Sequence, residues 1–76
     1  MRVLIIEDEV KVASFISEGL QEEGYKVAVA YDGKTGMDLI KEASFDIILL
    51  DLMIPEINGL EVLRNARAWG IDTPVL

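Results

Sequence analysis

Three acidic residues of this sequence follow two short apolar runs, where their carboxylates could do chemistry. Glu7 and Asp8 come directly after the run 3–6, and Asp51 comes directly after the run 47–50. Short, continuous runs of Val, Ile and Leu are typical of strands buried inside a parallel sheet. Ligands bind such sheets just outside the carboxyl ends of the strands. If the two strands are neighbours, we expect these three acids to meet at one edge of the sheet.

Carboxylates gathered at one edge would repel each other. At an effective dielectric constant of about 20, one pair at about 4 Å costs on the order of 4 kcal/mol before screening. Such a cluster persists when a pKa rises or when a cation is bound. Because the chain has no histidine and no cysteine, its oxygen ligands favour Mg²⁺ over Zn²⁺. A magnesium site beside a free carboxylate suits phosphoryl transfer, with the carboxylate as nucleophile.

Each acid also has a plainer interpretation, in which it only shapes the local backbone. Strands often end in Asp, and this residue starts a turn. Asp8 also lies where the N-cap of the following helix is expected, and an N-cap needs only a side-chain oxygen. Both interpretations remain open for each acid alone, whereas the acids at both strand ends taken together favour the metal site.

A magnesium-dependent NTPase half-domain, or an aspartyl-phosphate phosphatase, is the alternative function. The segment 33–35 copies the end of a P-loop, and 47–51 copies a Walker B strand. A P-loop needs a glycine five residues before Gly33, but that residue is Ala28, inside an expected strand. A phosphatase of this type usually has a second Asp two residues after the nucleophile, where this sequence has Met53. Both enzymes are therefore disfavoured.

The elements that must position the acids alternate along the chain. Strands are expected over 2–6, 26–30 and the run that ends before Asp51. Helices are expected from Val10 to Gly24, over 34–42, and through 60–66 up to Gly70, and a fourth strand is expected to begin within 73–76. This alternation predicts an α/β fold, with a parallel sheet, right-handed crossovers and helices on both faces.

Helical periodicity and capping residues add detail to two of these helices. Asp32 is expected to cap the second helix, and Gly24 to end the first. The residues expected to form the buried face of the first helix are Val12, Phe15, Ile16 and Leu20.

Composition limits the class of protein. A chain of 76 residues is one small domain, and its hydrophobic content of 51% fits buried parallel strands. A net charge of −7 argues against direct nucleic-acid contact, which needs Lys and Arg. No apolar run reaches the length of a membrane span, and the N-terminus enters a strand without the regions of a signal peptide. We therefore expect a cytoplasmic protein.

The combined spacing closely resembles the receiver domain of bacterial two-component response regulators. The residues that carry the resemblance are Glu7-Asp8, Asp51, Met53-Ile54-Pro55 and Asn58-Gly59, together with Tyr31-Asp32-Gly33 and Thr73-Pro74-Val75-Leu76. The details resemble most the subfamily with a winged-helix DNA-binding output domain. The implied fold is flavodoxin-like, a doubly wound parallel sheet.

The resemblance also implies a function. Asp51 would be the phosphoacceptor, taking a phosphoryl group from a sensor histidine kinase in a Mg²⁺-dependent reaction. Asp8 and Asp51 would hold Mg²⁺ through their side chains, and Met53 through its backbone carbonyl. Glu7 would act through a bound water or by contacting the direct ligands without coordinating the ion itself. The module would not be a turnover enzyme, and in the full protein it would control a DNA-binding transcriptional output.

The chain departs from the family pattern at its end. The family sheet has five strands, and its switch hydroxyl and phosphate-binding lysine follow strands four and five. Neither Lys34 nor Lys41 matches that lysine, and Thr73 does not match the hydroxyl. Residues 1–76 are therefore interpreted as the N-terminal part of a receiver domain, truncated after the start of strand four (βαβαβαβ) and incomplete for signalling. An open apolar edge predicts self-association, by sheet pairing or swapped elements.

Overall fold

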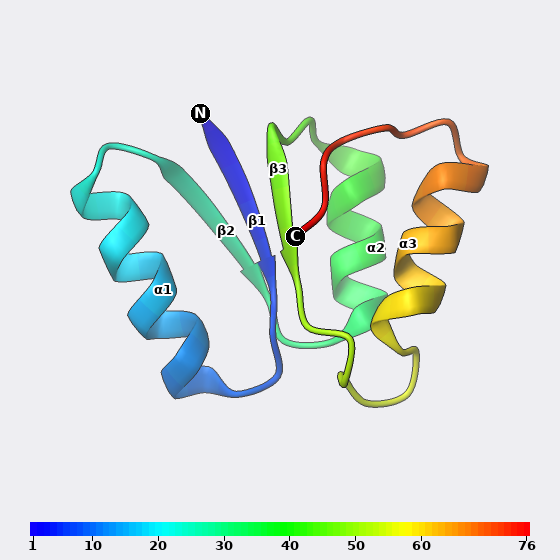
Figure 1. The fold of residues 1–76 in the computed structure, drawn as a ribbon, viewed down its shortest axis with the longest axis horizontal. Coiled ribbons are helices and arrows are strands. Elements are labelled where there is room, and N and C mark those ends of the chain that lie inside the picture. The colour runs from blue at the N-terminus through cyan, green and yellow to red at the C-terminus, as the bar shows by residue number, and fades with distance from the viewer.

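Strands and helices alternate strictly along the chain (Figure 1), and the computed structural model describes all 76 residues. The strands are β1 (Arg2–Ile6), β2 (Lys26–Ala30) and β3 (Ile47–Leu50), and they form one parallel sheet in the order β2-β1-β3. The helices are α1 (Val10–Glu22), α2 (Gly33–Glu42) and α3 (Gly59–Ala68). The α/β prediction is confirmed. No helix combines the length and the apolar character that crossing a membrane requires.

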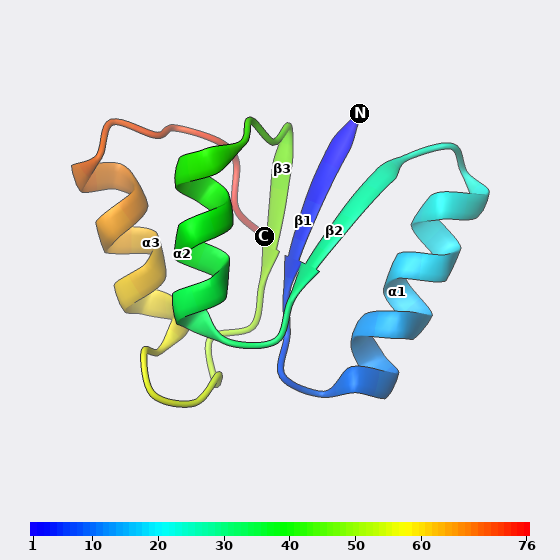
Figure 2. The ribbon, with the colours of Figure 1, turned by 180° about the vertical axis from the view of Figure 1, so that it is seen from behind.

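The central strand β1 has a helix layer on each side of it (Figures 1 and 2). Because side chains alternate along a strand, Val3 and Ile5 pack with Ala13 of α1, and Leu4 and Ile6 pack with residues of α2 and α3. All four of these β1 side chains are almost completely buried. Burial on both faces explains why the run is apolar without interruption.

The register of the sheet aligns the ends of its strands. Ile6 lies opposite Ala30 of β2 and opposite Leu50 of β3. The residues that follow, including Glu7 and Asp51, therefore leave the sheet at the same level. The condition that the first and third strands be neighbours is met.

A fourth segment pairs with the outer edge of β3. Ile48 forms a parallel bridge with Val75, and the amide of Leu76 donates to the carbonyl of Ile48 at 2.9 Å. The expected start of a fourth strand is confirmed as this single bridge. Ala28, in contrast, lies within β2 and pairs with Leu4, so the loop that a P-loop needs does not exist there.

The capping predictions for α1 and α2 have different outcomes. Asp32 Oδ1 accepts a 2.7 Å hydrogen bond from the amide of Thr35, so the predicted cap of α2 is confirmed. Gly24 has a left-handed φ of 91° directly after the C-cap of α1, as its helix-ending role requires. The N-cap of α1, however, is Glu9, and its side chain makes no capping bond. The prediction that Asp8 caps this helix is wrong.

The predicted buried face of α1 is only half correct. Ile16 and Leu20 pack against the sheet, but Phe15 is 80% exposed and Val12 is 38% exposed. The residue that is fully buried is Ala13. Its small side chain allows a close approach of helix and sheet. With Ala13 facing the sheet, Val12 and Phe15 point away from the core.

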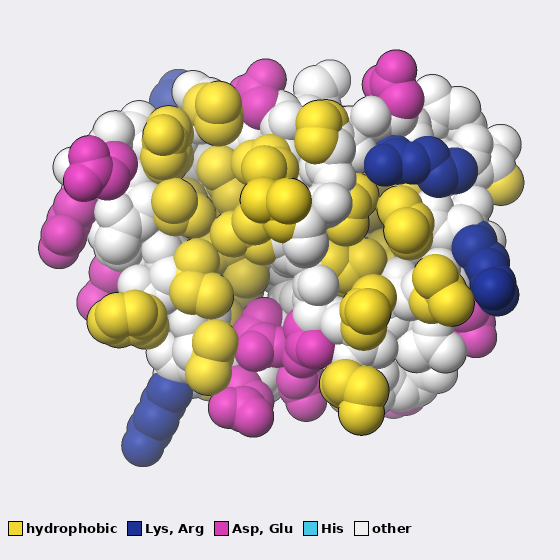
Figure 3. Space-filling model, viewed as in Figure 1, with side chains coloured by type: hydrophobic (Ala, Val, Ile, Leu, Met, Phe, Trp, Pro, Cys, Tyr) yellow, Lys and Arg dark blue, Asp and Glu magenta, His cyan; other side chains and the backbone are white.

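The sheet face on the α1 side is only partly covered, because α1 packs against β1 and β2. A groove remains between α1 and β3, and its lining includes Ile5, Ile16, Leu49 and Leu76. Figure 3 shows apolar side chains gathered over this face, with acidic side chains at its lower end. The groove therefore leads from the open side of the sheet to the edge where the acids lie.

Candidate functional site

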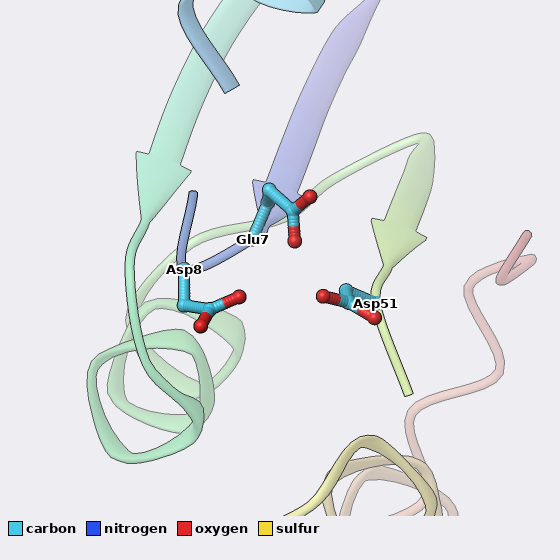
Figure 4. Close-up of side chains that lie close together, drawn as sticks. All are labelled: Glu7, Asp8 and Asp51. Carbon is cyan, nitrogen blue, oxygen red and sulfur yellow. The ribbon is translucent and has the colours of Figure 1, made fainter. Parts of the chain in front are cut away.

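The three predicted acids meet at the carboxyl edge of the sheet (Figure 4). Glu7 and Asp8 follow β1, and Asp51 follows β3. One carboxylate oxygen from each residue lies within 4.8 Å of those of the other two. Glu7 and Asp51 are partly buried and Asp8 is exposed. The prediction that the strand ends bring these residues together is confirmed.

Backbone hydrogen bonds hold two of the acids in place by extending the sheet one residue beyond its strands. The amide of Glu7 donates to the carbonyl of Ala30 at 3.0 Å, and the amide of Asp51 donates to the carbonyl of Ile6 at 3.0 Å. The positions of both residues are thus fixed by the same ladder that forms the core. The backbones of Glu7 and Asp51 are therefore held at the edge of the sheet.

Asp51 also begins a turn, as its plainer interpretation predicts. Its Oδ1 accepts a 2.9 Å hydrogen bond from the amide of Met53, the pattern of an Asx turn. The two interpretations of Asp51 are therefore compatible, because the turn orients the carboxylate that belongs to the cluster. The side chain of Met53 is 86% exposed and takes no part in this contact.

The carboxylates of Glu7 and Asp51 shift each other's pKa in opposite directions. A protonated Glu7 can donate a hydrogen bond to Asp51, and this bond, burial and the nearby negative charges raise the pKa of Glu7 to about 7. The same hydrogen bond and the amide of Met53 lower the pKa of Asp51. When the pair carries one proton, that proton therefore lies on Glu7, and Asp51 remains ionised.

The chemistry of the cluster fits a hard divalent cation. Glu7 Oε2 is buried and has no hydrogen-bond partner, which is costly for a polar atom unless something pairs with it. The donors are all carboxylate oxygens, the ligands that Mg²⁺ prefers. A bound cation would supply the missing partner charge without requiring a proton on Glu7.

Comparison with known proteins identifies the family. The profile of the response regulator receiver domain matches residues 3–76. The chain belongs to the response regulator receiver domain family. The predicted resemblance is therefore confirmed over almost the whole chain.

Individual receiver proteins agree with this assignment. The transcriptional regulatory protein DltR of Streptococcus agalactiae is 41% identical over 76 residues, which cover 100% of this chain and 34% of DltR. The response regulator ArlR of Staphylococcus saprophyticus is 48% identical over 75 residues, which cover 99% of this chain and 34% of ArlR. The chain thus spans about a third of the length of these relatives.

A solved receiver structure confirms the flavodoxin-like fold. The structure of response regulator TrrA from Thermotoga maritima, in complex with Mg(2+)-BeF, matches with a TM-score of 0.91 and 32% identity. The match covers 97% of this chain and 64% of the TrrA chain. The α/β fold that the element order predicted is therefore the fold of a receiver, and this chain spans about two thirds of the TrrA chain.

Asp8 reaches the receiver site in place of capping α1. Figure 4 shows its carboxylate turned towards the space that it shares with Glu7 and Asp51. An N-cap side chain must fold back onto the first turn of its helix, and Asp8 cannot do both. Asp8 therefore serves the cluster, and α1 begins without a side-chain cap.

Two residues that did not match the family's switch positions lie away from the acids. The ammonium of Lys41 lies 4.2 Å from the centre of the Trp69 ring, near the C-terminal end of α2. The hydroxyl of Thr73 donates to the carbonyl of Phe45, just before β3 and at its opposite end from Asp51. Neither side chain is placed to contact a group held at the acidic edge.

Asn58 is among the residues that carry the resemblance, but its capping role was not predicted from the sequence. Asn58 Oδ1 accepts a 3.0 Å hydrogen bond from the amide of Glu61 and caps α3. The signal was present, because Asn followed three residues later by Glu is typical of a helix N-terminus. This cap fixes the end of the segment that begins at Asp51.

Proposed function

We propose that residues 1–76 form a phosphoacceptor module in which Asp51 receives a phosphoryl group from a sensor histidine kinase. The observation that carries this proposal is the meeting of Glu7, Asp8 and Asp51 at the carboxyl edge of neighbouring parallel strands. Membership of the receiver family and the similarity to TrrA, which was solved with Mg(2+)-BeF, support it.

The transfer itself requires an ionised carboxylate. One oxygen of Asp51 forms a bond to phosphorus while the P–N bond of the phosphohistidine breaks, and the electron pair of that bond stays on the imidazole. The lowered pKa of Asp51 keeps this carboxylate in its nucleophilic form. Glu7 can carry the proton of the pair near neutral pH, because its pKa is raised to about 7.

The acids would hold Mg²⁺ in the roles that the resemblance implies. Asp8 and Asp51 would bind through their side chains and Met53 through its backbone carbonyl. Glu7 would act through water or from outside the set of direct ligands. Phosphorylation adds roughly −1.5 to −2 charge, if the acyl phosphate titrates like a phosphoserine. Mg²⁺ supplies positive charge that offsets this addition beside two existing acids.

The wider role of the protein follows from its longer relatives. DltR is a transcriptional regulatory protein, and this chain covers 34% of it. We propose that a longer protein carrying residues 1–76 controls transcription in the cytoplasm through a DNA-binding output. The acidic segment 1–76 itself would not contact DNA, and it would act as a signalling module and not as a turnover enzyme.

Self-association is the second proposed property. Six of the eight residues that line the groove between α1 and β3 are apolar, and one of them, Leu76, is 76% exposed. Residues 74–76 also form the outer edge of the sheet that the structure describes. A second copy of the chain could cover both surfaces. Sedimentation velocity should show dimers or larger species that Leu76→Glu weakens, and a monomer at all concentrations would contradict the proposal.

The metal part of the function can be tested on the 76-residue chain. In an NMR titration with Mg²⁺, we expect Asp8→Asn and Asp51→Asn each to weaken binding at least about tenfold. Asp72→Asn is a matched control, because this exposed acid lies beside Thr73, at the other end of the sheet. Equal Mg²⁺ affinity in all three variants would contradict the assigned site.

A further inference from the structure

The segment from Asp51 to Asn58 carries the proposed phosphoacceptor and joins β3 to α3. We call it the acceptor loop. Figures 1 and 2 show it passing beneath the N-terminal ends of α2 and α3. Its backbone is unusual at Glu56, which has a left-handed φ of 65°. A loop of this shape needs supports that fix where its first residue points.

Gly59 supports the end of the loop at Asp51. A Cβ atom placed on Gly59 would lie 2.6 Å from the carbonyl oxygen of Asp51 and 2.6 Å from Cα of Leu52. The amide of Gly59 also donates to the carbonyl of Leu52 at 3.2 Å. The first residue of α3 therefore rests directly on the backbone of the acceptor, at a distance that only glycine permits.

Gly33 supports the other end of the loop from a different helix. A Cβ atom on Gly33 would lie 2.6 Å from the carbonyl oxygen of Ile57 and 3.1 Å from its Cβ. Asp32 fixes the conformation of the first turn of α2, because it accepts hydrogen bonds from the amide and the hydroxyl of Thr35. A side chain at this position would therefore push on the loop backbone.

Space, and not backbone conformation, requires glycine at both positions. The glycines with a positive φ are Gly24 and Gly70, so Gly33 and Gly59 have dihedral angles that other residues adopt. An alanine at either position would be strained only by what it touches. At both positions the shortest of these contacts, 2.6 Å, is with the backbone of the acceptor loop, and at Gly33 the added atom would also lie 3.2 Å from the side chain of Val62.

We propose that Gly33 and Gly59 are positioning residues for Asp51. They allow the acceptor loop to pack closely against the first turns of α2 and α3. This packing sets the position of the Asp51 carboxylate relative to Glu7 and Asp8. The inference rests on the proposed function of Asp51. A displacement of well under 1 Å is enough to matter, since functional groups must be held within about 0.5 Å of their productive geometry.

The test compares alanine variants of three glycines in the 76-residue chain. In Gly33→Ala and Gly59→Ala we expect Mg²⁺ affinity to fall roughly tenfold, the lower end of what the loss of a supporting contact costs a metal site. Gly19→Ala is the matched control, because a Cβ there has nothing within 4 Å. This control should bind Mg²⁺ like the unmodified chain.

Two further measurements separate positioning from a general loss of stability. Ile40→Val weakens the core under α2 and should lower stability while leaving Mg²⁺ affinity unchanged. The amide signal of Met53 reports its hydrogen bond to Asp51. In metal-free samples we expect this signal to shift in Gly33→Ala and Gly59→Ala, which we call the loop-contact variants, but not in Ile40→Val. Titrations are made at a temperature where circular dichroism shows each variant folded. If Gly59→Ala does not fold, Gly33→Ala decides alone.

The outcomes distinguish this inference from the proposed function. If Asp51→Asn abolishes Mg²⁺ binding but both loop-contact variants bind normally, the positioning role of Gly33 and Gly59 is wrong, while the proposed function of Asp51 is unaffected. If Ile40→Val loses as much affinity as they do, the effect is only one of stability and the inference is overturned. If the unmodified chain does not bind Mg²⁺, the proposed function itself fails.

Discussion

The amide of Met53 donates a 2.9 Å hydrogen bond to Oδ1 of Asp51. The residue two positions after the proposed phosphoacceptor thus orients its carboxylate through the backbone alone, while the thioether points into solvent. The site therefore depends on the path of the chain after β3 more than on the side chains along it.

Met53→Ala should leave both stability and Mg²⁺ affinity almost unchanged. The side chain is 86% exposed, and surface substitutions usually change the free energy of unfolding by less than about 0.5 kcal/mol. The amide and carbonyl that the site uses are kept in the variant. Urea unfolding and a Mg²⁺ titration check this expectation, and a large loss of affinity would mean that the thioether itself takes part.

The metal-free chain should lose stability as the pH rises from about 5 to 8. The pKa of Glu7 is about 7 in the fold and 4.5 ordinarily, so between these values the folded state binds more protons than the unfolded state. Stability then decreases with pH, and the contribution is lost above pH 7. The lowered pKa of Asp51 acts below its ordinary value of 3.8, outside this window.

Urea unfolding at pH 5 and pH 8 measures this change, and Glu7→Gln is its control. Glutamine cannot titrate, so the variant should show a flatter pH dependence than the unmodified chain. Added Mg²⁺ should stabilise the chain more at pH 8, where the metal meets no competing proton on Glu7. An equal pH dependence in chain and variant would show that Glu7 titrates normally.

Asn58→Ala should destabilise the fold by about 1 kcal/mol, because it removes the side-chain cap of α3. Asn58→Asp keeps an acceptor oxygen and should retain most of the stability. Thermal unfolding followed by circular dichroism compares the two variants. If both lose the same amount, the cap is not the reason for the loss.

Phe15→Ser should be nearly neutral for stability, within about 0.5 kcal/mol. Helical spacing alone predicts that Phe15 is buried, but the structure leaves 80% of it exposed. Ile16→Ser is the contrasting variant, because Ile16 packs on the sheet beside Ala13. Equal losses in the two variants would contradict the placement of α1.

Local sequence patterns predict much of this fold. The apolar run of β1 predicted a strand buried on both faces, and the acids after two strands predicted one cluster, because parallel strands end at the same edge. The buried face of α1 was harder to predict. Its fully buried residue is Ala13, which is buried because its small side chain allows close packing, whereas helical spacing favours large apolar residues. Asp8 suits a cap or a cluster equally well, and only the neighbouring strand decides between them.

The supports of the acceptor loop are harder still to find from the sequence. Gly33 and Gly59 are both among the residues that carry the resemblance, but each follows a helix cap, and the sequence alone does not show which atoms either one contacts. Their close contacts are with Ile57 and with the backbone of Asp51 and Leu52. For Gly33 the partner is distant in the sequence, and no periodicity or motif links the two residues.

Intact mass spectrometry tests the proposed phosphorylation of Asp51 most directly. A longer protein that carries residues 1–76 is incubated with acetyl phosphate and Mg²⁺, alongside its Asp51→Asn variant and an Asp72→Asn control. We predict the added mass of one phosphoryl group in the unmodified protein and in the control, and none in Asp51→Asn. A phosphoryl group that persists in Asp51→Asn, or that never appears in the unmodified protein, would contradict the account.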